Sequence, residues 1–203
     1  MYALVENGQI TKIFSYPKGF ELNNNQYSAK IFTLWSQAEK EAIGIYEIIT
    51  DSTNYKDPAY YNNTNEQYTF ANGQVTKSWG TATAKRLNDE NAVDEDGNNI
   101  LEDGVQVINY GLKTEKKKIV KQQASNLLAP TDWYVVKATE VADYDIPANI
   151  LSFRADVRTK SNEMETMINN CTTVDELKAL YEYTEQQDGT ITRPLPEFPK
   201  EVI

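Results

Sequence analysis

The sequence predicts an α+β protein whose N-terminal half is rich in β-strands and whose C-terminal half is helical. Two Asn-Gly pairs, at 7–8 and 72–73, lie between β-rich runs, which is the strongest short-range signal for a two-residue hairpin. In the second half, apolar residues recur every three or four positions, as on one face of an α-helix. The predicted domains are a β-rich domain over 1–112, a helical domain over 113–190 and a proline-rich arm over 191–203.

The β-rich half contains two predicted hairpins with a short helix between them. The hairpins pair 2–6 with 9–14 and 68–71 with 74–77. Ser36 and Glu39 form a capping-box pattern, in which each side chain satisfies a free backbone N–H of the other residue. Gly44 ends this helix where left-handed geometry is needed. The run 45–50 alternates well enough to be a strand.

Residues 88–104 form an acidic insert between the two halves. We compared it with a calcium-binding EF-hand loop starting at Asp94. Such a loop needs Gly at its sixth position and Glu at its twelfth, whereas this chain has Asn99 and Val105 there. Because the EF-hand pattern fails, we expect turns at the two Asp-Gly pairs. A looser surface calcium site is the alternative.

The first two helices predicted in the C-terminal half form a helical hairpin. One begins at Thr114, a candidate N-cap, and ends near Ala129, because the following proline disfavours helical geometry in the residue before it. The next runs from about Pro147, whose missing N–H costs nothing in a first turn, to Asn170. Its apolar residues recur at steps of about 3.5, a pattern typical of a helical hairpin or an inter-chain bundle. Ser161 interrupts this stripe.

The chain ends in a short helix and an extended arm. Thr173 and Glu176 repeat the capping-box pattern before this last helix. The tail from Thr192 onward contains three closely spaced prolines, which exclude it from helix and sheet interiors. We therefore expect an extended arm that lies on another surface.

Composition and charge exclude several classes of function. The 203-residue chain has a formal net charge of -10, which argues against a broad nucleic-acid surface because phosphates require clustered Lys and Arg. The lysine run 113–121 is predicted to be the solvated face of a helix, with a binding patch as the alternative. No signal peptide is visible, and no apolar run approaches the roughly 20 residues of a membrane span. We expect neither nucleic acid nor membrane as a partner.

Residue usage also argues against catalysis. The chain has no histidine, the commonest general base and transition-metal ligand. The single cysteine, Cys171, cannot form an intrachain disulfide and is expected to be buried. Carboxylates are too abundant for any one pair to indicate a glycosidase. We therefore predict a non-enzymatic protein with no cofactor and no metal.

One stretch of the helical half resembles a known family. Leu128–Trp133 reads L-A-P-T-D-W, and Phe153–Arg158 reads F-R-A-D-V-R. Together they resemble the small helical domain of phage tail-fibre assembly chaperones, with its Leu-Ala pair, Thr-Asp-Trp, and aromatic-Arg pair ahead of a second Arg. The resemblance covers about residues 115–183. This chain has Phe153 where Tyr is usual and an insertion over 137–145. The resemblance implies a helical domain that binds fibre subunits.

The N-terminal half carries a second resemblance. Its opening, Y-A-L-V-E-N-G from Tyr2, and the run A-K-I-F-T-L-W-S from Ala29 resemble the front half of uncharacterised tail-region proteins of marine phages. This second resemblance implies no chemistry.

The candidate partner-docking residues are Asp132, Trp133, Phe153, Arg154 and Arg158. Trp133 and the three residues after it are predicted to form an apolar clamp between two helices. Burial of Trp133 would contribute on the order of 2–3 kcal/mol. The two arginines lie four apart on one helix face, with Asp132 and Asp156 as candidate ion-pair partners. They either tie the connector to the long helix or face a partner.

A tyrosine-rich loop over 51–67 supplies another candidate site. Tyr55, Tyr60 and Tyr61 would form a glycan platform if their rings stacked on sugars, making the chain a carbohydrate-binding module. We favour the alternative, in which the rings pack onto the sheet and the hydroxyls face water.

These observations favour a bacteriophage virion protein, a tail-associated structural or adaptor subunit. It would be made in the host cytoplasm, form a homo-oligomer and dock to fibre or other tail proteins. Two hairpins, a long amphipathic helix and a proline-rich arm are typical of subunits that lock to neighbours. The alternative is a tail-fibre assembly chaperone that is not retained in the particle.

Overall fold

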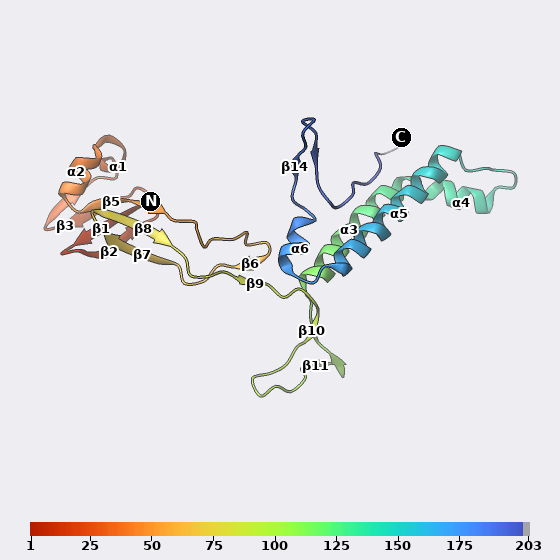
Figure 1. Cartoon of the computed structure of the whole chain (residues 1–203), viewed down its shortest axis with the longest axis horizontal. Coiled ribbons are helices and arrows are strands. Elements are labelled where there is room, and N and C mark those ends of the chain that lie inside the picture. The colour runs from red at the N-terminus through yellow and green to blue at the C-terminus, as the bar shows by residue number, and fades with distance from the viewer. Residues whose placement is uncertain (201–203) are drawn as a thin grey trace. The chain divides into compact units, whose positions relative to one another are not determined.

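The structure of this chain is a computed structural model that describes residues 1–200. It has two compact units, Met1–Thr83 and the chain from Ala84 onward. Strands dominate the first unit, and helices form most of the regular structure of the second (Figure 1). The predicted α+β class is therefore confirmed.

The division between the units falls at Thr83 rather than at residue 112, where we expected it. Contacts far apart in sequence explain the difference. The Leu112 N–H donates to the carbonyl of Arg86 at 2.9 Å, and the Asp89 carboxylate accepts from the Gly111 N–H at 2.8 Å. The segment before the first long helix is thus fastened to the start of that helix.

The first unit is built on a five-stranded sheet with the order β2-β1-β5-β8-β7. Its strands are β1 (Tyr2–Glu6), β2 (Gln9–Phe14), β5 (Ile45–Thr50), β7 (Gln67–Ala71) and β8 (Gln74–Ser78). Only the β5–β8 pair is parallel among these neighbours. The outer strands β2 and β7 also contact each other, so the sheet curls until its two edge strands approach each other.

Both Asn-Gly hairpins form as predicted. The φ angles of Asn7 and Gly8 are 52° and 80°, and those of Asn72 and Gly73 are 52° and 73°. Positive φ at both central residues is the requirement of a type I′ turn. The turn chemistry therefore explains the register of β7 with β8 and of the β1–β2 pairs next to the turn, and an irregularity between Leu4 and Val5 shifts the rest of the β1–β2 register.

Apolar side chains lie on both faces of this sheet, because residues along a strand alternate between its faces. Ala3, Val5, Ile48 and Val75 cluster on one face. On the other face, Leu4, Phe14 and Ile45 pack against Phe20, Ile31 and Phe32. That second face is covered by the hairpin of β3 (Phe20–Leu22) with β4 (Asn25–Tyr27) and by α1 (Ile31–Leu34). The unit thus has apolar clusters on both sides of one sheet.

The helix α2 (Gln37–Ala42) has the predicted capping box. The Ser36 hydroxyl accepts from the Glu39 N–H at 3.3 Å, and the Glu39 carboxylate accepts from the Ser36 N–H at 2.8 Å. Gly44 follows the helix with φ +82°, and a Cβ there would lie 2.5 Å from the Val5 carbonyl oxygen. Both its conformation and its close approach to β1 therefore require glycine.

The acidic insert forms an arm at the start of the second unit. Beyond the short pair β6 (Tyr61–Asn62) and β9 (Thr83–Ala84), β10 (Glu90–Asn91) pairs with β13 (Ile108–Asn109), and β11 (Leu101–Glu102) pairs with β12 (Val105–Gln106). Gly97, Asp103 and Gly104 have φ angles of 84°, 50° and 79°. The expected turns are therefore confirmed at both Asp-Gly pairs. We call residues 88–109 the acidic arm.

The helices of the second unit are α3 (Leu112–Leu128), the 3-10 turn η1 (Ala129–Thr131), α4 (Asp132–Glu140), α5 (Ala148–Asn170) and α6 (Val174–Ala179). The predicted N-cap of α3 was wrong, because Gly111 occupies that position rather than Thr114. The Thr114 hydroxyl instead donates to Asp89 at 2.8 Å. A side chain of the arm thus contacts the first turn of this helix without capping its backbone.

The predicted apolar clamp after Pro130 was also wrong. The chain stays helical through η1 into α4, because proline loses no hydrogen bond at the start of a helical turn. Trp133 is 51 % exposed and Val136 52 % exposed. These side chains therefore form part of the surface instead of filling a connector.

The apolar stripe of α5 packs against α3, as its spacing predicted. Phe153 and Val157 cluster with Ala124, and the small Ser161 is buried within the same stripe. The capping box of Thr173 and Glu176 at α6 is confirmed. The apolar contacts hold α3 and α5 together.

The C-terminal arm lies against its own helical unit. A short hairpin, β14 (Thr184–Glu185) with β15 (Ile191–Thr192), precedes it. Leu195 is buried, its N–H donates to the Leu180 carbonyl at 3.0 Å, and Phe198 packs on the α3–α5 cluster. The last part of the predicted arm, 201–203, lies outside the described residues.

Candidate partner-docking site

Arg154 of α5 is at the centre of a hydrogen-bond network. Its Nη1 donates to Thr131 Oγ1 at 2.6 Å and to the Leu128 carbonyl at 3.0 Å, while its Nη2 lies 2.8 Å from Asp132 Oδ1. The Thr131 hydroxyl in turn donates to the Leu128 carbonyl at 2.8 Å. One guanidinium, with several donors in a fixed plane, thereby joins the end of α3 and the start of α4 to α5.

Because the Arg154 side chain is buried, the network must satisfy its charge and its hydrogen-bond donors. The Arg154 side chain is 8 % exposed, and its partner Asp132 is 61 % exposed. A buried cation is costly unless it is paired and hydrogen-bonded. The carboxylate and the carbonyl at the negative end of the α3 dipole supply that compensation. The predicted ion pair between connector and long helix is confirmed, and it fixes where α4 begins.

A cationic groove lies beside this ion pair. It has a volume of about 440 Å³ and is lined by α3 and α5, including Lys121, Ser125, Arg158 and Asn162. Exposed Arg158 donates to the Arg154 carbonyl at 3.3 Å, which places its guanidinium along the groove. Within residues 1–200, Asp156 forms no ion pair with either arginine. The groove therefore offers a cation and neutral donors to an anionic group.

A second groove, of about 330 Å³, runs along the start of α4. It is lined by Pro130, Thr131, Trp133, Tyr134, Pro147, Asn149 and Ile150. The Trp133 and Tyr134 ring centroids lie 3.8 Å apart. Trp133 and Val136 are three residues apart, so they share one side of the helix. We call Trp133, Tyr134 and Val136 the docking face.

The predicted docking residues thus divide into two groups. Asp132, Trp133, Arg154 and Arg158 line the two grooves. Phe153 is 4 % exposed within the α3–α5 cluster, so its role is structural. Sequence reasoning missed Thr131 as a partner of Arg154. The sequence did contain a signal for a helix start at this position, because Pro, Thr and Asp are common in the first residues of a helix.

The tyrosine loop does not assemble the predicted platform. Tyr60 and Tyr61 are 5 % and 4 % exposed, whereas Tyr55 is 44 % exposed and packs on the Trp79 ring at 4.8 Å. The Lys56 ammonium lies 4.4 Å from the centroid of Tyr61. Two of the three rings are therefore buried and have no face available for a sugar.

The carboxylate of Asp94 acts as a turn cap in the acidic arm. Its Oδ1 accepts from the N–H groups of Asp96 and Asn98 at 3.0 and 2.8 Å. These bonds, with that of Asn98 foremost, lower the pKa of Asp94. In the described part of the chain, no group of three or more acidic or Cys side chains is placed to hold a metal ion.

Burial raises the pKa of Cys171, the one cysteine, which is buried as predicted. None of the helices within residues 1–200 has the length and apolarity needed to cross a bilayer. A scan against protein-family models, a search of curated proteins and a search of solved structures each found no match to this chain.

Proposed function

We propose that this chain is a non-enzymatic structural or adaptor subunit of a bacteriophage tail that docks to fibre or other tail proteins through the docking face. The observation that carries the proposal is an exposed Trp133 next to Asp132, which pairs with the buried Arg154. Tryptophan is the residue most enriched among interface hot spots. An apolar ring exposed on a fixed helix is a suitable anchor for a partner.

The anchor reduces the cost of binding. Ordering loops and side chains at an interface costs free energy, so a preorganised surface binds more tightly than a mobile one. Arg154 holds the junction between α3 and α4 through three acceptors, and the Trp133 ring packs closely against the Tyr134 ring in a tilted arrangement. The docking face is therefore ordered before any partner arrives.

The two grooves define the chemistry of the partner. The groove at Trp133 and Pro147 suits an apolar or proline side chain, because its lining is largely aromatic and aliphatic. The neighbouring groove at Arg158 suits a carboxylate, which pairs well with guanidinium. A partner segment carrying an apolar residue and an acidic residue would occupy both.

The phage assignment rests on the resemblance of Leu128–Trp133 and Phe153–Arg158 to the chaperone family. That resemblance spans the elements that carry the docking face. A chaperone would use the same face but leave before the particle matures. The two functions therefore differ in whether the chain stays in the particle.

The test replaces Trp133 by Ala in the phage that encodes this chain. Particles are purified and the chain is quantified by mass spectrometry against the capsid protein. We expect particles with Trp133→Ala to lack the chain. The matched control is Ile191→Ala, which removes an apolar side chain that is 68 % exposed on β15 and should leave incorporation unchanged. Equal incorporation of both variants would overturn docking through α4.

A further inference from the structure

Two surfaces of opposite charge lie next to each other in sequence within the second unit. From Asn88 to Gly111 the chain has seven acidic residues and no lysine or arginine, and α3 has five lysines and one acid. The chain as a whole carries a net charge of -10. Against that background, a helix with an excess of lysine is a local exception that favours an acidic partner.

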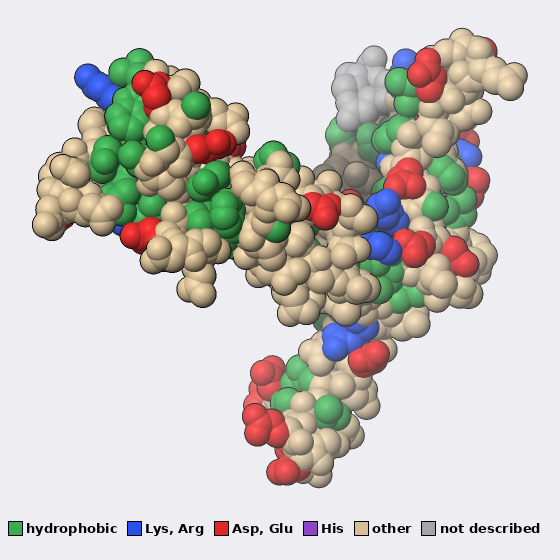
Figure 2. All heavy atoms as spheres, turned by 60° about the vertical axis from the view of Figure 1, so that its left-hand side comes forward, with side chains coloured by type: hydrophobic (Ala, Val, Ile, Leu, Met, Phe, Trp, Pro, Cys, Tyr) green, Lys and Arg blue, Asp and Glu red, His purple; other side chains and the backbone are tan. Residues whose placement is uncertain are grey.

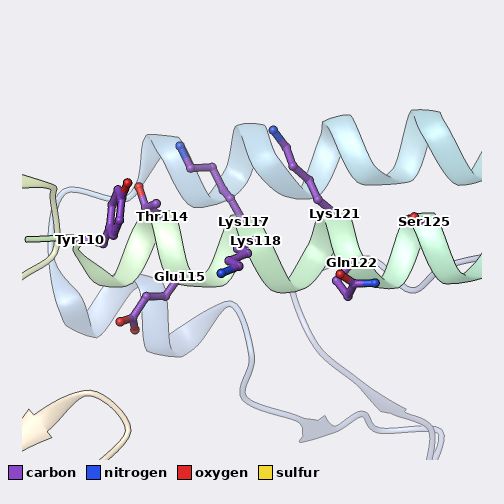
Figure 3. A pocket seen from close by; sticks show the side chains of 8 residues that line it. All are labelled: Tyr110, Thr114, Glu115, Lys117, Lys118, Lys121, Gln122 and Ser125. Atoms are coloured by element: carbon purple, nitrogen blue, oxygen red, sulfur yellow. The ribbon is translucent and has the colours of Figure 1, made fainter. Parts of the chain in front are cut away.

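The lysine surface is a groove of about 790 Å³ along α3. Its lining includes Tyr110, Thr114, Lys117, Lys118 and Lys121. Lys117 and Lys121 point to one side of the helix, and Lys118 points to the other (Figure 3). Tyr110 is 63 % exposed at the end of the groove. The groove thus combines cations with an apolar ring, and we call it the lysine groove.

The acidic arm has the complementary surface. Leu101 is 58 % exposed and Val105 is 69 % exposed, although both lie in the β11–β12 hairpin. Glu102 pairs directly with Val105 across that hairpin, so the two side chains share a face. Acidic and hydrophobic side chains lie together at the end of this arm (Figure 2). Its tip therefore offers carboxylates beside apolar groups.

The base of the arm directs its tip away from its own α3. The Asp89 carboxylate accepts from Gly111 and Thr114 at the start of the helix, and β10 pairs with β13 just beyond it. From this base the arm runs away from the helix (Figure 1). The tip of one chain therefore meets the lysine groove of another chain more readily than its own.

We propose that the acidic arm of one copy docks in the lysine groove of a second copy. The Glu102 carboxylate of the arm faces Lys117, while Val105, which shares a hairpin face with Glu102, covers the lysine stem and the Tyr110 ring; Glu95 and Lys118 add to the opposite charge of the two surfaces. Donor and receiver surfaces differ, so the contact is heterologous and propagates into a ring or an open filament. The lysine groove shares Lys121 and Ser125 with the cationic groove beside Arg154, but this contact is centred on Lys117 and Tyr110 and does not rest on the proposed tail function.

Charge-reversal variants of the full chain test the contact by sedimentation velocity. Glu95→Lys with Glu102→Lys removes the donor, and Lys117→Glu with Lys118→Glu removes the receiver. We expect the natural chain to self-associate at low salt and to dissociate at high salt, since salt screens exposed charges. Each double variant alone should be monomeric. Lys12→Glu with Lys18→Glu, in the first unit, makes the same charge change as the receiver variant and should still associate.

Mixing the two double variants gives the decisive result. One variant keeps an intact arm and the other an intact lysine groove, so the mixture should form a one-to-one complex and nothing larger. A chain carrying all four reversals should associate again, which also shows that the variants fold. A monomeric natural chain at low salt, or a mixture that stays monomeric, would overturn the proposal. The proposal would also be overturned if the natural chain associates and both double variants associate equally well.

Discussion

Arg154 Nη2 and Asp132 Oδ1 lie 2.8 Å apart, but only the aspartate is well exposed, at 61 % of its side chain against 8 % for the arginine. The two partners therefore differ in what their loss costs. Without Arg154, the Asp132 carboxylate is hydrated by water. Without Asp132, a buried guanidinium loses its only counter-charge within the described network.

We predict that replacing the exposed partner destabilises the chain more than replacing the buried one. Asp132→Ala should lower the free energy of unfolding by about 3 kcal/mol, because it leaves an uncompensated buried charge. Arg154→Met should cost about 1–2 kcal/mol for its unpaired neutral acceptors. Urea unfolding followed by far-UV circular dichroism measures both. Asp156→Asn, an exposed acid on α5, is the control and should change stability by less than about 0.5 kcal/mol. A larger loss of stability for Arg154→Met than for Asp132→Ala would contradict this account.

Replacing Phe153 by Ala should cost more stability than replacing Trp133 by Ala. Phe153 is 4 % exposed and Trp133 51 % exposed. Phe153→Ala should cost about 3–5 kcal/mol by leaving a cavity, whereas Trp133→Ala should cost about 1–2 kcal/mol because half of its surface already meets water. Thermal and urea unfolding of the purified variants measure this. Equal losses would show that Trp133 is a core residue in solution.

Local patterns predicted most of the fold. The Asn-Gly hairpins, the capping boxes at Ser36 and Thr173, and the apolar stripe of α5 all depend on residues close in sequence, and all are present. Each sets backbone geometry within a few residues. The sequence therefore contained the information needed for these elements.

The errors arose where distant segments decide the outcome. The N-cap of α3 and the domain boundary depend on Asp89, which lies far from Gly111 in sequence but bonds to it. The exposure of Trp133 depends on η1, which continues the helical path past Pro130. A tryptophan predicts burial on average, yet its exposure here follows from the direction in which Arg154 fixes α4. No local pattern includes that contact.

Gly44 and Gly8 form a matched pair for testing close approach in the first unit. Both have φ near +80°, but a Cβ at Gly44 would lie 2.5 Å from the Val5 carbonyl oxygen, while a Cβ at Gly8 would have nothing within 4 Å. Gly8→Ala should cost about 1 kcal/mol for its left-handed backbone. Gly44→Ala should cost more than about 2 kcal/mol, because a backbone group must also move. Hydrogen exchange of the β1 and β5 amides measures the loss of stability in each variant. Similar losses for Gly8→Ala and Gly44→Ala would contradict the role of the close approach at Gly44.

The capping box of α6 predicts a dependence on pH. Hydrogen bonds from Thr172, the backbone N–H first and the hydroxyl next, lower the pKa of Glu176 from its ordinary value of 4.5. A carboxyl whose pKa is lowered on folding stabilises the protein above its unfolded pKa and loses that contribution as pH falls through its folded pKa. Glu176→Gln should therefore destabilise the chain at neutral pH and matter progressively less below about pH 4.5. Urea midpoints across this range measure it, and a difference that stays constant with pH would rule the explanation out.

The most direct test of the tail proposal is mass spectrometry of purified phage particles, with copies of this chain counted against the capsid protein. A structural subunit should be present in a small fixed number, a multiple of three or six, as expected for closed rotational symmetry. Complete absence from particles, together with abundance in the infected-cell lysate, would contradict a retained subunit and favour the assembly chaperone.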